Sequence, residues 1–279
     1  MIEILTDSCS DLNQELLDAH RIRQIPFVVT LGEETYLDGE TITTPQLFEK
    51  VAQSGLFPKT AAPSPADFIT LFDSPNEMIY IGISSQLSAG HQVASKVAES
   101  LTDKKIHVID SHNLSTGIAL SVLTACDLRD KGCSVEEIIT GVEEVKPHVH
   151  TTFIIDKLDY LYKGGRCSAM EHVVGSMLHI RPVIEVDAAK GTMDVKEKIN
   201  GSRKKALNSM LIDFESHLPN VDLKRVFLTH TGCDEDALYL KKELLKLAPI
   251  ENVYITHTGC TVATHAGPDT IGILYILKE

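Results

Sequence analysis

Hydroxyl-bearing residues at the end of an apolar run carry the clearest chemical signal in this chain. Residues 78–83 form an apolar, β-branched run typical of a buried strand, followed by Ser84, Ser85 and Ser88 before a helix-like stretch begins near His91. Side-chain hydroxyls and free backbone N–H groups converge where a strand leads into a helix, and together they can bind an anionic oxygen. Serines also cap helices routinely, so the pattern alone leaves both interpretations open.

Three further segments carry polar groups suited to an anion. Thr60 lies in a stretch whose prolines favour a loop over a helix, and two later segments read Gly164-Gly165-Arg166 and His265-Ala266-Gly267-Pro268. Glycines let a backbone approach a ligand closely, and a guanidinium offers a planar fork to a carboxylate or phosphate. Each segment alone is generic, because a glycine pair is usually a turn and a lone histidine is more often structural.

Composition narrows the class of protein. The chain has 279 residues, of which 43% are hydrophobic, and a net charge of −13. This length favours two domains, and the acidic charge argues against a nucleic-acid partner, which would need basic stripes. Six scattered cysteines without a C-x-x-C pair, no signal peptide and no apolar run of about 20 residues predict a soluble cytoplasmic protein with free thiols.

The first half alternates strand and helix patterns. Strands are expected at 2–6, 27–30, 78–83 and 106–109, and helices are expected to begin near 11, 44, 64, 91 and 134. Strands separated by helices predict a parallel, doubly wound sheet that binds ligands at the carboxyl ends of its strands.

The pattern changes near Pro147. Further strands are expected at 151–155, 182–187, 193–197, 226–230, 253–257 and 271–277, with a hairpin turn at 189–191 and helices at 203–217 and 235–246. We therefore predict an α/β protein of two domains. Residues 1–150 would form a domain with a parallel sheet, and residues 151–279 a smaller α/β domain with a mixed sheet.

In combination the polar segments are specific. Their order and spacing resemble the DegV family over nearly the whole chain, through the motifs Thr6-Asp7-Ser8, Tyr36-Leu37-Asp38-Gly39, Thr60-x-x-Pro63-Ser64-Pro65, Ser84-Ser85-x-Leu87-Ser88, Asp110-Ser111, Leu158-x-Tyr160-Leu161-x-x-Gly164-Gly165-Arg166 and His265-x-Gly267-Pro268.

The resemblance implies a bacterial fatty-acid-binding protein without a cofactor. Its first domain would be a three-layer α/β/α unit, and a long-chain fatty acid such as palmitate would lie in a tunnel near the domain interface. The resemblance also implies that the protein presents the lipid to a separate ATP-dependent kinase subunit, which would form acyl phosphate for phospholipid synthesis.

Individual residues match the family's site. Thr60, Ser88 and His265 would bind the carboxylate, and Ser84, Ser85, Gly164, Gly165 and Arg166 would lie near the head group or the domain interface. His265 and Arg166 are expected at the tunnel mouth, with His265 titrating near neutrality and sharing a hydrogen-bond network with Ser88. The chain departs from the family pattern at Ala62, Ala89-Gly90 and Asn200.

Other functions remain open at this stage. A passive lipid carrier needs no kinase. A serine hydrolase would use Ser88 as nucleophile, His265 as base and Asp7 or Asp110 to orient it, although no G-x-S-x-G elbow surrounds Ser88. An autonomous kinase lacks a phosphate-binding G-x-x-x-x-G-K-[ST] loop. A metal site at His148-Val149-His150 has two ligands and no third, so no metal is expected.

Overall fold

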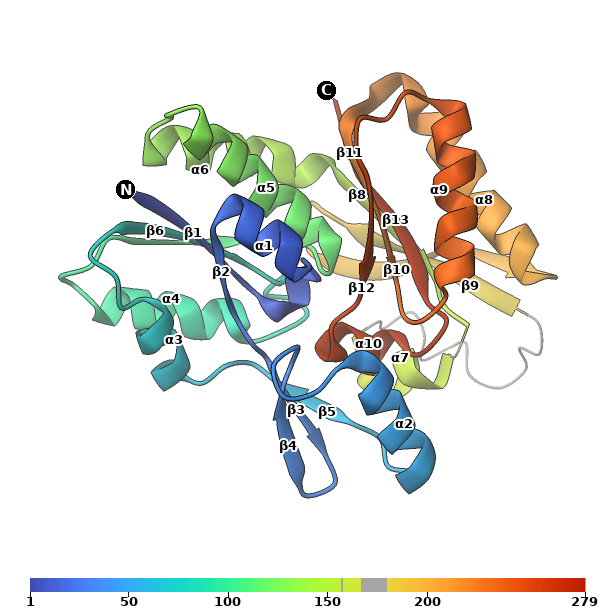
Figure 1. Ribbon diagram of the computed structural model, residues 1–279, viewed down its shortest axis with the longest axis horizontal. Helices are drawn as coiled ribbons and strands as arrows, with labels where there is room; N and C mark the ends of the chain where they lie inside the picture. The colour runs from blue at the N-terminus through green and yellow to red at the C-terminus, as the bar shows by residue number, and fades with distance from the viewer. Residues whose placement is uncertain (157, 167–179, 279) are drawn as a thin grey trace.

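A four-stranded parallel sheet forms one end of the protein, in a computed structural model that describes residues 1–156, 158–166 and 180–278 (Figure 1). Its strand order is β2 (Ile22–Ile25), β1 (Ile2–Asp7), β6 (Glu77–Gly82) and β7 (Ile106–Asp110). Alternate residues of β1 and β6 face opposite sides, so both faces of this sheet are buried.

Helices cover both faces of the parallel sheet. One face packs on α1 (Gln14–His20), α5 (Thr116–Asp130) and α6 (Val135–Val145), and the other on α3 (Pro65–Leu71) and α4 (Gly90–Ser100). The helix expected from residue 11 begins at Gln14, because the Asn13 side chain accepts a hydrogen bond from the Leu16 amide and so caps the helix there. The three-layer α/β/α arrangement is confirmed.

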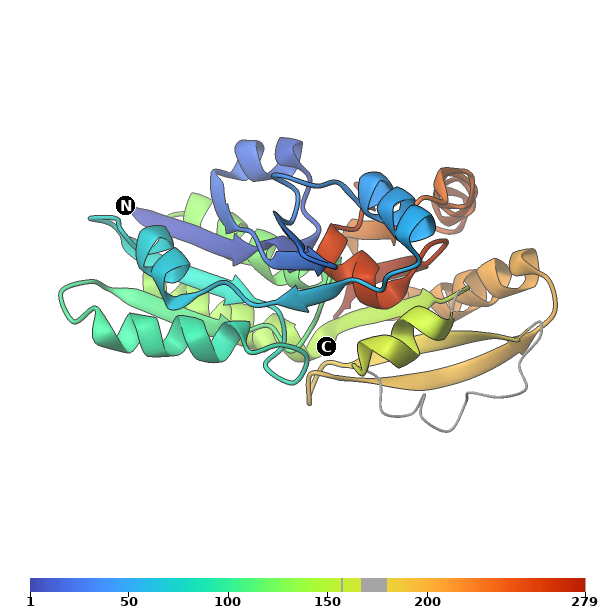
Figure 2. The ribbon, with the colours of Figure 1, turned by 90° about the horizontal axis from the view of Figure 1, so that it is seen from below.

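A six-stranded mixed sheet lies beside the first sheet (Figure 2). Its order is β10 (Thr192–Asn200), β9 (Ile180–Asp187), β8 (Val149–Ile154), β13 (Ile271–Leu277), β11 (Val221–His230) and β12 (Val253–His257), antiparallel except for β11 and β12. Helices α8 (Arg203–His217) and α9 (Asp234–Leu247) pack on one face. The predicted mixed sheet is therefore confirmed.

Helix α5 joins the two sheets through one hydrophobic core. Ten of its fifteen residues are buried, and the core around it includes side chains of β1 and β6 as well as β8, β11 and β13. A helix that is apolar on all sides suits a position between two packed layers. The division into domains at residue 150 stays a prediction.

A small antiparallel sheet corrects the expected topology. The strand expected at 27–30 is β3 (Val28–Leu31), which pairs with β4 (Glu34–Leu37) and β5 (Lys59–Ala61) and not with the parallel sheet. Helix α2 (Thr44–Ser54) follows this hairpin, which projects from the rest of the molecule (Figure 1). Two short helices that the sequence did not predict, α7 (Leu158–Gly164) and α10 (Cys260–Ala266), pack together beside it.

Candidate functional site

A narrow cavity lies where the three sheets meet. This cavity, the channel, has a volume of about 80 Å³. Its surface is mainly apolar and comes from the mixed sheet, the small sheet, the segments that follow β6 and precede α5, and the helices α7 and α10: Phe27, Thr60, Ile83, Leu87, Ser88, Leu114, Ser115, Thr151, Phe153, Leu161, Arg166, Met193, Thr229, Thr258, Thr261, Val262, His265, Ala266, Thr270, Gly272 and Leu274. Four residues expected at the site (Thr60, Ser88, Arg166 and His265) therefore meet at this cavity.

Thr60 and His265 form the central polar contact of the cavity wall. The Thr60 Oγ1 and His265 Nε2 atoms are 2.8 Å apart, although the residues are 205 positions apart in the chain. Thr60 lies on β5, where it pairs with Val29 of β3, so the expected loop is a short strand. The His265 Nε2 atom bonds Thr60 directly, and a hydrogen-bond network that also includes Ser88 stays a prediction.

His265 is a neutral side chain at physiological pH. Burial lowers the pKa of His265 to about 4, with a further contribution from the nearby Arg166 guanidinium. The expectation that this residue titrates near neutrality is therefore wrong. Its Nδ1 atom is buried without a hydrogen-bond partner among the described residues.

Ser88 enters the cavity wall from the segment between β6 and α4. Its Oγ atom accepts a hydrogen bond from the Gly90 amide at 3.2 Å, which leaves the hydroxyl hydrogen free to donate. Gly90 also allows a close approach of Phe27, since a Cβ atom at this position would lie 3.0 Å from the tip of that ring. The departure from the family pattern at residue 90 thus makes room for a cavity-lining phenyl ring.

Two buried carboxylates hold the N-terminus of α10, the helix that carries His265. Asp38 accepts hydrogen bonds from the Cys260 and Thr261 amides at 2.6 and 3.0 Å, and Asp11 accepts one from the Gly259 amide at 2.7 Å. Burial raises the pKa of Asp11 well above its usual value. The sequence analysis did not identify this role, although the Asp38-Gly39 motif was its signal.

The Gly164-Gly165-Arg166 segment helps to position His265, in addition to its expected role near a ligand. A Cβ atom on Gly164 would lie 2.5 Å from His265 Nδ1, so this glycine makes room for the imidazole. Gly165 has a φ of +64°, a conformation that favours glycine at the end of α7. The Arg166 side chain reaches the cavity and donates from Nη1 to the Gly164 carbonyl at 2.6 Å.

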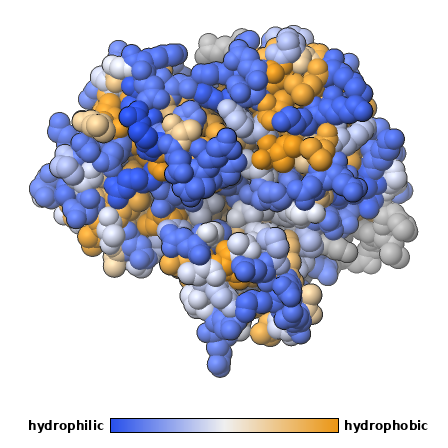
Figure 3. Space-filling model, in the orientation of Figure 1, coloured by the Kyte–Doolittle hydropathy of each residue, from blue (hydrophilic) through white to orange (hydrophobic). Residues whose placement is uncertain are grey.

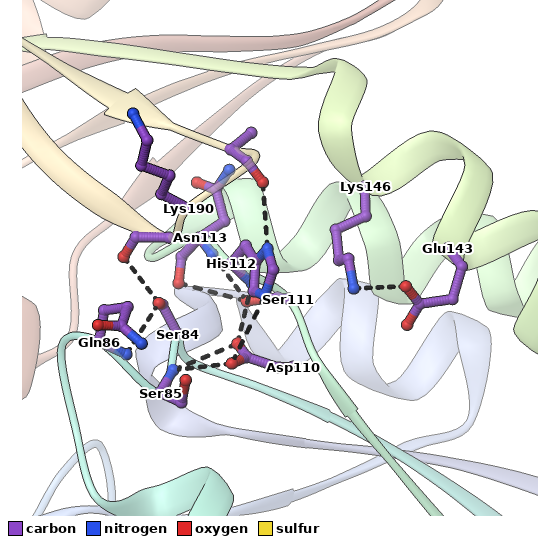
Figure 4. A network of polar contacts seen from close by, with 12 residues as sticks. Ser84, Ser85, Gln86, Asp110, Ser111, His112, Asn113, Glu143, Lys146 and Lys190 are labelled. Atoms are coloured by element: carbon purple, nitrogen blue, oxygen red, sulfur yellow. Dashed lines mark hydrogen bonds and ion pairs between the residues drawn. The ribbon is translucent and has the colours of Figure 1, made fainter.

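Ser84 and Ser85 lie outside the cavity lining, so of the two places expected for them, the head group and the domain interface, their contacts favour the interface. The buried Ser84 hydroxyl donates to the Gly191 carbonyl at 2.7 Å, and the Ser85 amide donates to Asp110. Figure 4 shows these serines beside Asp110, His112 and the hairpin that carries Lys190. Their polar groups connect the end of β6 to the hairpin between β9 and β10.

The residues proposed for a serine hydrolase do not assemble into a triad. Asp7 is buried and accepts hydrogen bonds from the Tyr80 hydroxyl at 2.8 Å and the Ile83 amide at 3.0 Å. Burial raises the pKa of Asp7 to about 6 against the effect of these bonds. Asp110 bonds the Ser85 and His112 amides, so neither acid orients His265.

The surface and the thiols add two observations. The face in Figure 3 is mostly hydrophilic, with separate hydrophobic patches rather than one continuous apolar surface. The five described cysteines carry free thiols, and Cys167 lies outside the described residues. Across the part of the chain that the structure describes, no helix combines the length and apolar character needed to cross a bilayer.

Comparison with known proteins identifies similar chains of the same length. The profile of the DegV family, described as uncharacterised, matches residues 1–278. A DegV domain-containing protein of Caldanaerobacter subterraneus is 32% identical, with 98% of each chain covered. A DegV family protein from Thermus thermophilus, described by its fatty acid binding, has a TM-score of 0.90 at 28% identity and 99% coverage of both chains. The Streptococcus pneumoniae Fatty Acid Kinase (Fak) B3 protein, loaded with linoleic acid, shares the fold with a TM-score of 0.87 at 23% identity and complete coverage of both chains.

Proposed function

This chain belongs to the DegV family, and from that membership and the cavity we propose that it binds one long-chain fatty acid. The acyl chain occupies the channel, and its carboxylate accepts hydrogen bonds from Thr60 and Ser88, with His265 supporting Thr60. Fatty acid binding by the Thermus thermophilus relative, whose fold this chain shares, supports the ligand class.

The state of the two hydroxyls is the observation that carries this proposal. The Ser88 oxygen already accepts a hydrogen bond from the Gly90 amide, so its hydrogen is available to a ligand. A neutral imidazole carries one N–H, and in the proposed tautomer this proton is on Nε2 and is donated to the Thr60 oxygen. Thr60 then also has a free hydrogen, and the two O–H groups suit a carboxylate.

The apolar lining supplies most of the affinity. A buried methylene contributes about 0.8 kcal/mol, so a sixteen-carbon tail gives on the order of 10 kcal/mol before the costs of association. Neutral hydroxyls are then sufficient for the head group, and no buried lysine is required.

The second part of the proposal concerns phosphoryl transfer. A carboxylate held by neutral donors keeps its negative charge and its nucleophilicity. In the presence of a separate kinase subunit, a carboxylate oxygen attacks the γ-phosphorus of ATP, the bond to ADP breaks, and acyl phosphate forms. The Fak B3 protein, which carries the name of a fatty acid kinase, has the same fold, and this motivates the proposed role. In this proposal the kinase subunit supplies the catalytic groups, and the reaction takes place in the cytoplasm.

Lipid analysis and a paired variant test the binding site. Mass spectrometry of lipid extracted from natively purified protein should identify a fatty acid. In a fluorescent fatty-acid displacement assay, Thr60→Val and Ser88→Ala should each weaken binding about tenfold, as expected for the loss of one charge-assisted hydrogen bond. Thr70→Ala, on the exposed side of α3, is the matched control and should bind as the wild type does. Unchanged affinity in the Thr60→Val, Ser88→Ala double variant, with the fold intact, would refute the site.

A reconstitution separates a presenting subunit from a passive carrier. Loaded protein should yield acyl phosphate with ATP only when an ATP-binding kinase subunit is added. If the loaded protein supports no turnover with any fatty acid kinase subunit, the carrier function is favoured instead.

A further inference from the structure

We propose that a cluster beneath the C-terminal half of α8 binds a divalent transition-metal ion such as Zn²⁺. His150 on β8 and the pair Asp213 and His217 on α8 each offer a ligand atom, and these atoms all lie within 4.8 Å of one another. The two helix residues are four positions apart, so they share one face of α8. Of the two histidines in the motif at residues 148–150, His150 belongs to the cluster and His148 does not, and α8 supplies the other two candidate ligands.

The side chains around the cluster orient the candidate ligands toward one point. The His150 Nε2 and Asp213 Oδ2 atoms are 3.0 Å apart, a separation typical of two ligands on one metal. The other nitrogen of His150, Nδ1, faces the Glu185 carboxylate at 3.8 Å, and His217 Nδ1 lies 2.9 Å from the Tyr275 hydroxyl. A carboxylate or hydroxyl on the far nitrogen of a histidine fixes the tautomer that leaves the near nitrogen as the ligand.

The charges of the cluster also favour a cation. Lys196 bonds Asp213 Oδ1 and Glu185 Oε1, both at 2.8 Å, and it leaves Asp213 Oδ2 directed toward His150. Two carboxylates thus face one ammonium group, and these three side chains together carry a net negative charge. Imidazole and carboxylate ligands suit Zn²⁺, Ni²⁺ and Co²⁺ better than Ca²⁺ or Mg²⁺.

A second group of similar composition lacks this arrangement. His230, Asp234 and His257 also lie close together. The Cys233 amide, however, donates to His230 Nδ1 at 3.1 Å, which places the proton of the neutral ring on Nε2, the nitrogen nearer Asp234. That nitrogen has no lone pair to offer a metal, so the geometry favours the cluster at His150. None of the His150 cluster residues lines the channel, so this proposal is independent of lipid binding.

Metal titration of untagged, EDTA-treated full-length protein tests the site. Zn²⁺ followed by calorimetry and Co²⁺ followed by its visible absorption should each show one saturable equivalent with nitrogen ligation. His150→Ala and His217→Ala should each weaken binding at least tenfold, as expected for the loss of one ligand. His148→Ala is the matched control and should bind as the wild type does.

A third variant tests the proposal if a histidine variant folds poorly. Asp213→Asn keeps the shape of the side chain, and it should also weaken Zn²⁺ binding while the circular dichroism spectrum is unchanged. The proposal is overturned if the wild type shows no saturable binding, or if binding survives His150→Ala and His217→Ala and is lost in His257→Ala.

Discussion

The two ends of α10 carry polar groups in opposite states. At the N-terminal end, three consecutive amides from Gly259 to Thr261 each donate to a carboxylate of Asp11 or Asp38. At the C-terminal end, the His265 ring bonds Thr60 through Nε2, and its Nδ1 atom is buried without a partner among the described residues. The backbone amides of the first turn are thus paired within the protein, whereas the imidazole at the other end keeps polar capacity beside an apolar channel.

This difference distinguishes the groups that hold α10 in the fold from the groups that can bind a ligand. Buried donors and acceptors that pair with each other stabilise the fold and have nothing left for a ligand. Polar groups that face a cavity with a free hydrogen can bind an anion without displacing an existing partner. The short helix works as a fixed support, because the carboxylates that hold its first turn also determine where His265 meets Thr60.

Removing the Asp38 carboxylate, which holds the first turn of α10, should cause the largest free-energy change, a loss of stability. Asp38→Ala leaves the Cys260 and Thr261 amides and the Ser8 hydroxyl without their acceptor. We expect the free energy of unfolding to fall by about 4 kcal/mol, since each buried unsatisfied donor costs about 1–3 kcal/mol. Urea denaturation measures this loss. Asp234→Ala, an exposed acid at the start of α9, is the control and should change stability little; equal stability of the two variants would contradict the anchoring role.

The buried His265 imidazole should make the free energy of unfolding depend on pH. Because the pKa of His265 is about 4 in the folded protein and 6.5 in its reference state, the unfolded chain takes up a proton in this window and the folded chain does not. The stability that this group contributes is complete above pH 6.5 and is lost as the pH falls toward 4, a change of about 3 kcal/mol.

A variant isolates this contribution from that of Asp7. The pKa of Asp7 is raised from 3.8 to about 6, so the folded chain takes up that proton first and stability changes in the opposite direction between these values. The difference between wild type and His265→Gln, measured by urea denaturation from pH 7 to pH 4, therefore reports on His265 alone. Parallel curves for the two proteins would show that the imidazole is not held neutral.

A side chain added next to the His265 imidazole should weaken ligand binding. The expected free-energy change is smaller than the two changes in stability described above. A methyl group at Gly164 would meet His265 Nδ1 at 2.5 Å and push the ring away from Thr60. We expect Gly164→Ala to weaken fatty-acid binding about tenfold, equivalent to roughly 1.4 kcal/mol. The displacement assay measures this change, and Lys163→Ala is the neighbouring control. Wild-type affinity in Gly164→Ala would mean that the position of the ring is unimportant for the carboxylate.

The sequence predicted the large elements well because their signals are local. Apolar runs such as 78–83 and capping residues such as Ser134 determine strand and helix positions over a few residues. The helices at 158–164 and 260–266 were missed, since each is only seven residues long and α10 is held by carboxylates more than 200 positions away. The small sheet containing Thr60 also depends on pairing between distant segments.

The sequence predicted which residues line the site better than it predicted which partners they contact. Motifs brought Thr60, Ser88 and His265 to attention, and these residues do line one cavity. Their partners depend on packing, which no spacing in the chain encodes. Ser84 resembles Ser88 in the sequence, but its hydroxyl is used by the hairpin at Gly191. The pKa of His265 likewise follows from burial, which becomes visible only in the fold.

Arg166 gives the smallest expected effect on lipid binding and the sharpest test of the comparison. Its guanidinium already donates to the Gly164 carbonyl, and it lowers the pKa of His265. Arg166→Ala should therefore leave fatty-acid affinity within about twofold, while the pKa of His265, followed by NMR titration, should rise as the neighbouring cation is removed.

With a kinase subunit, the same variant should form acyl phosphate more slowly, because the mouth of the channel loses a cation that would face the incoming phosphates. Lys163→Ala, at an exposed position of α7, controls for a general loss of positive charge. If Arg166→Ala instead loses its lipid, the guanidinium binds the carboxylate directly, and the head group does not depend on neutral hydroxyls alone.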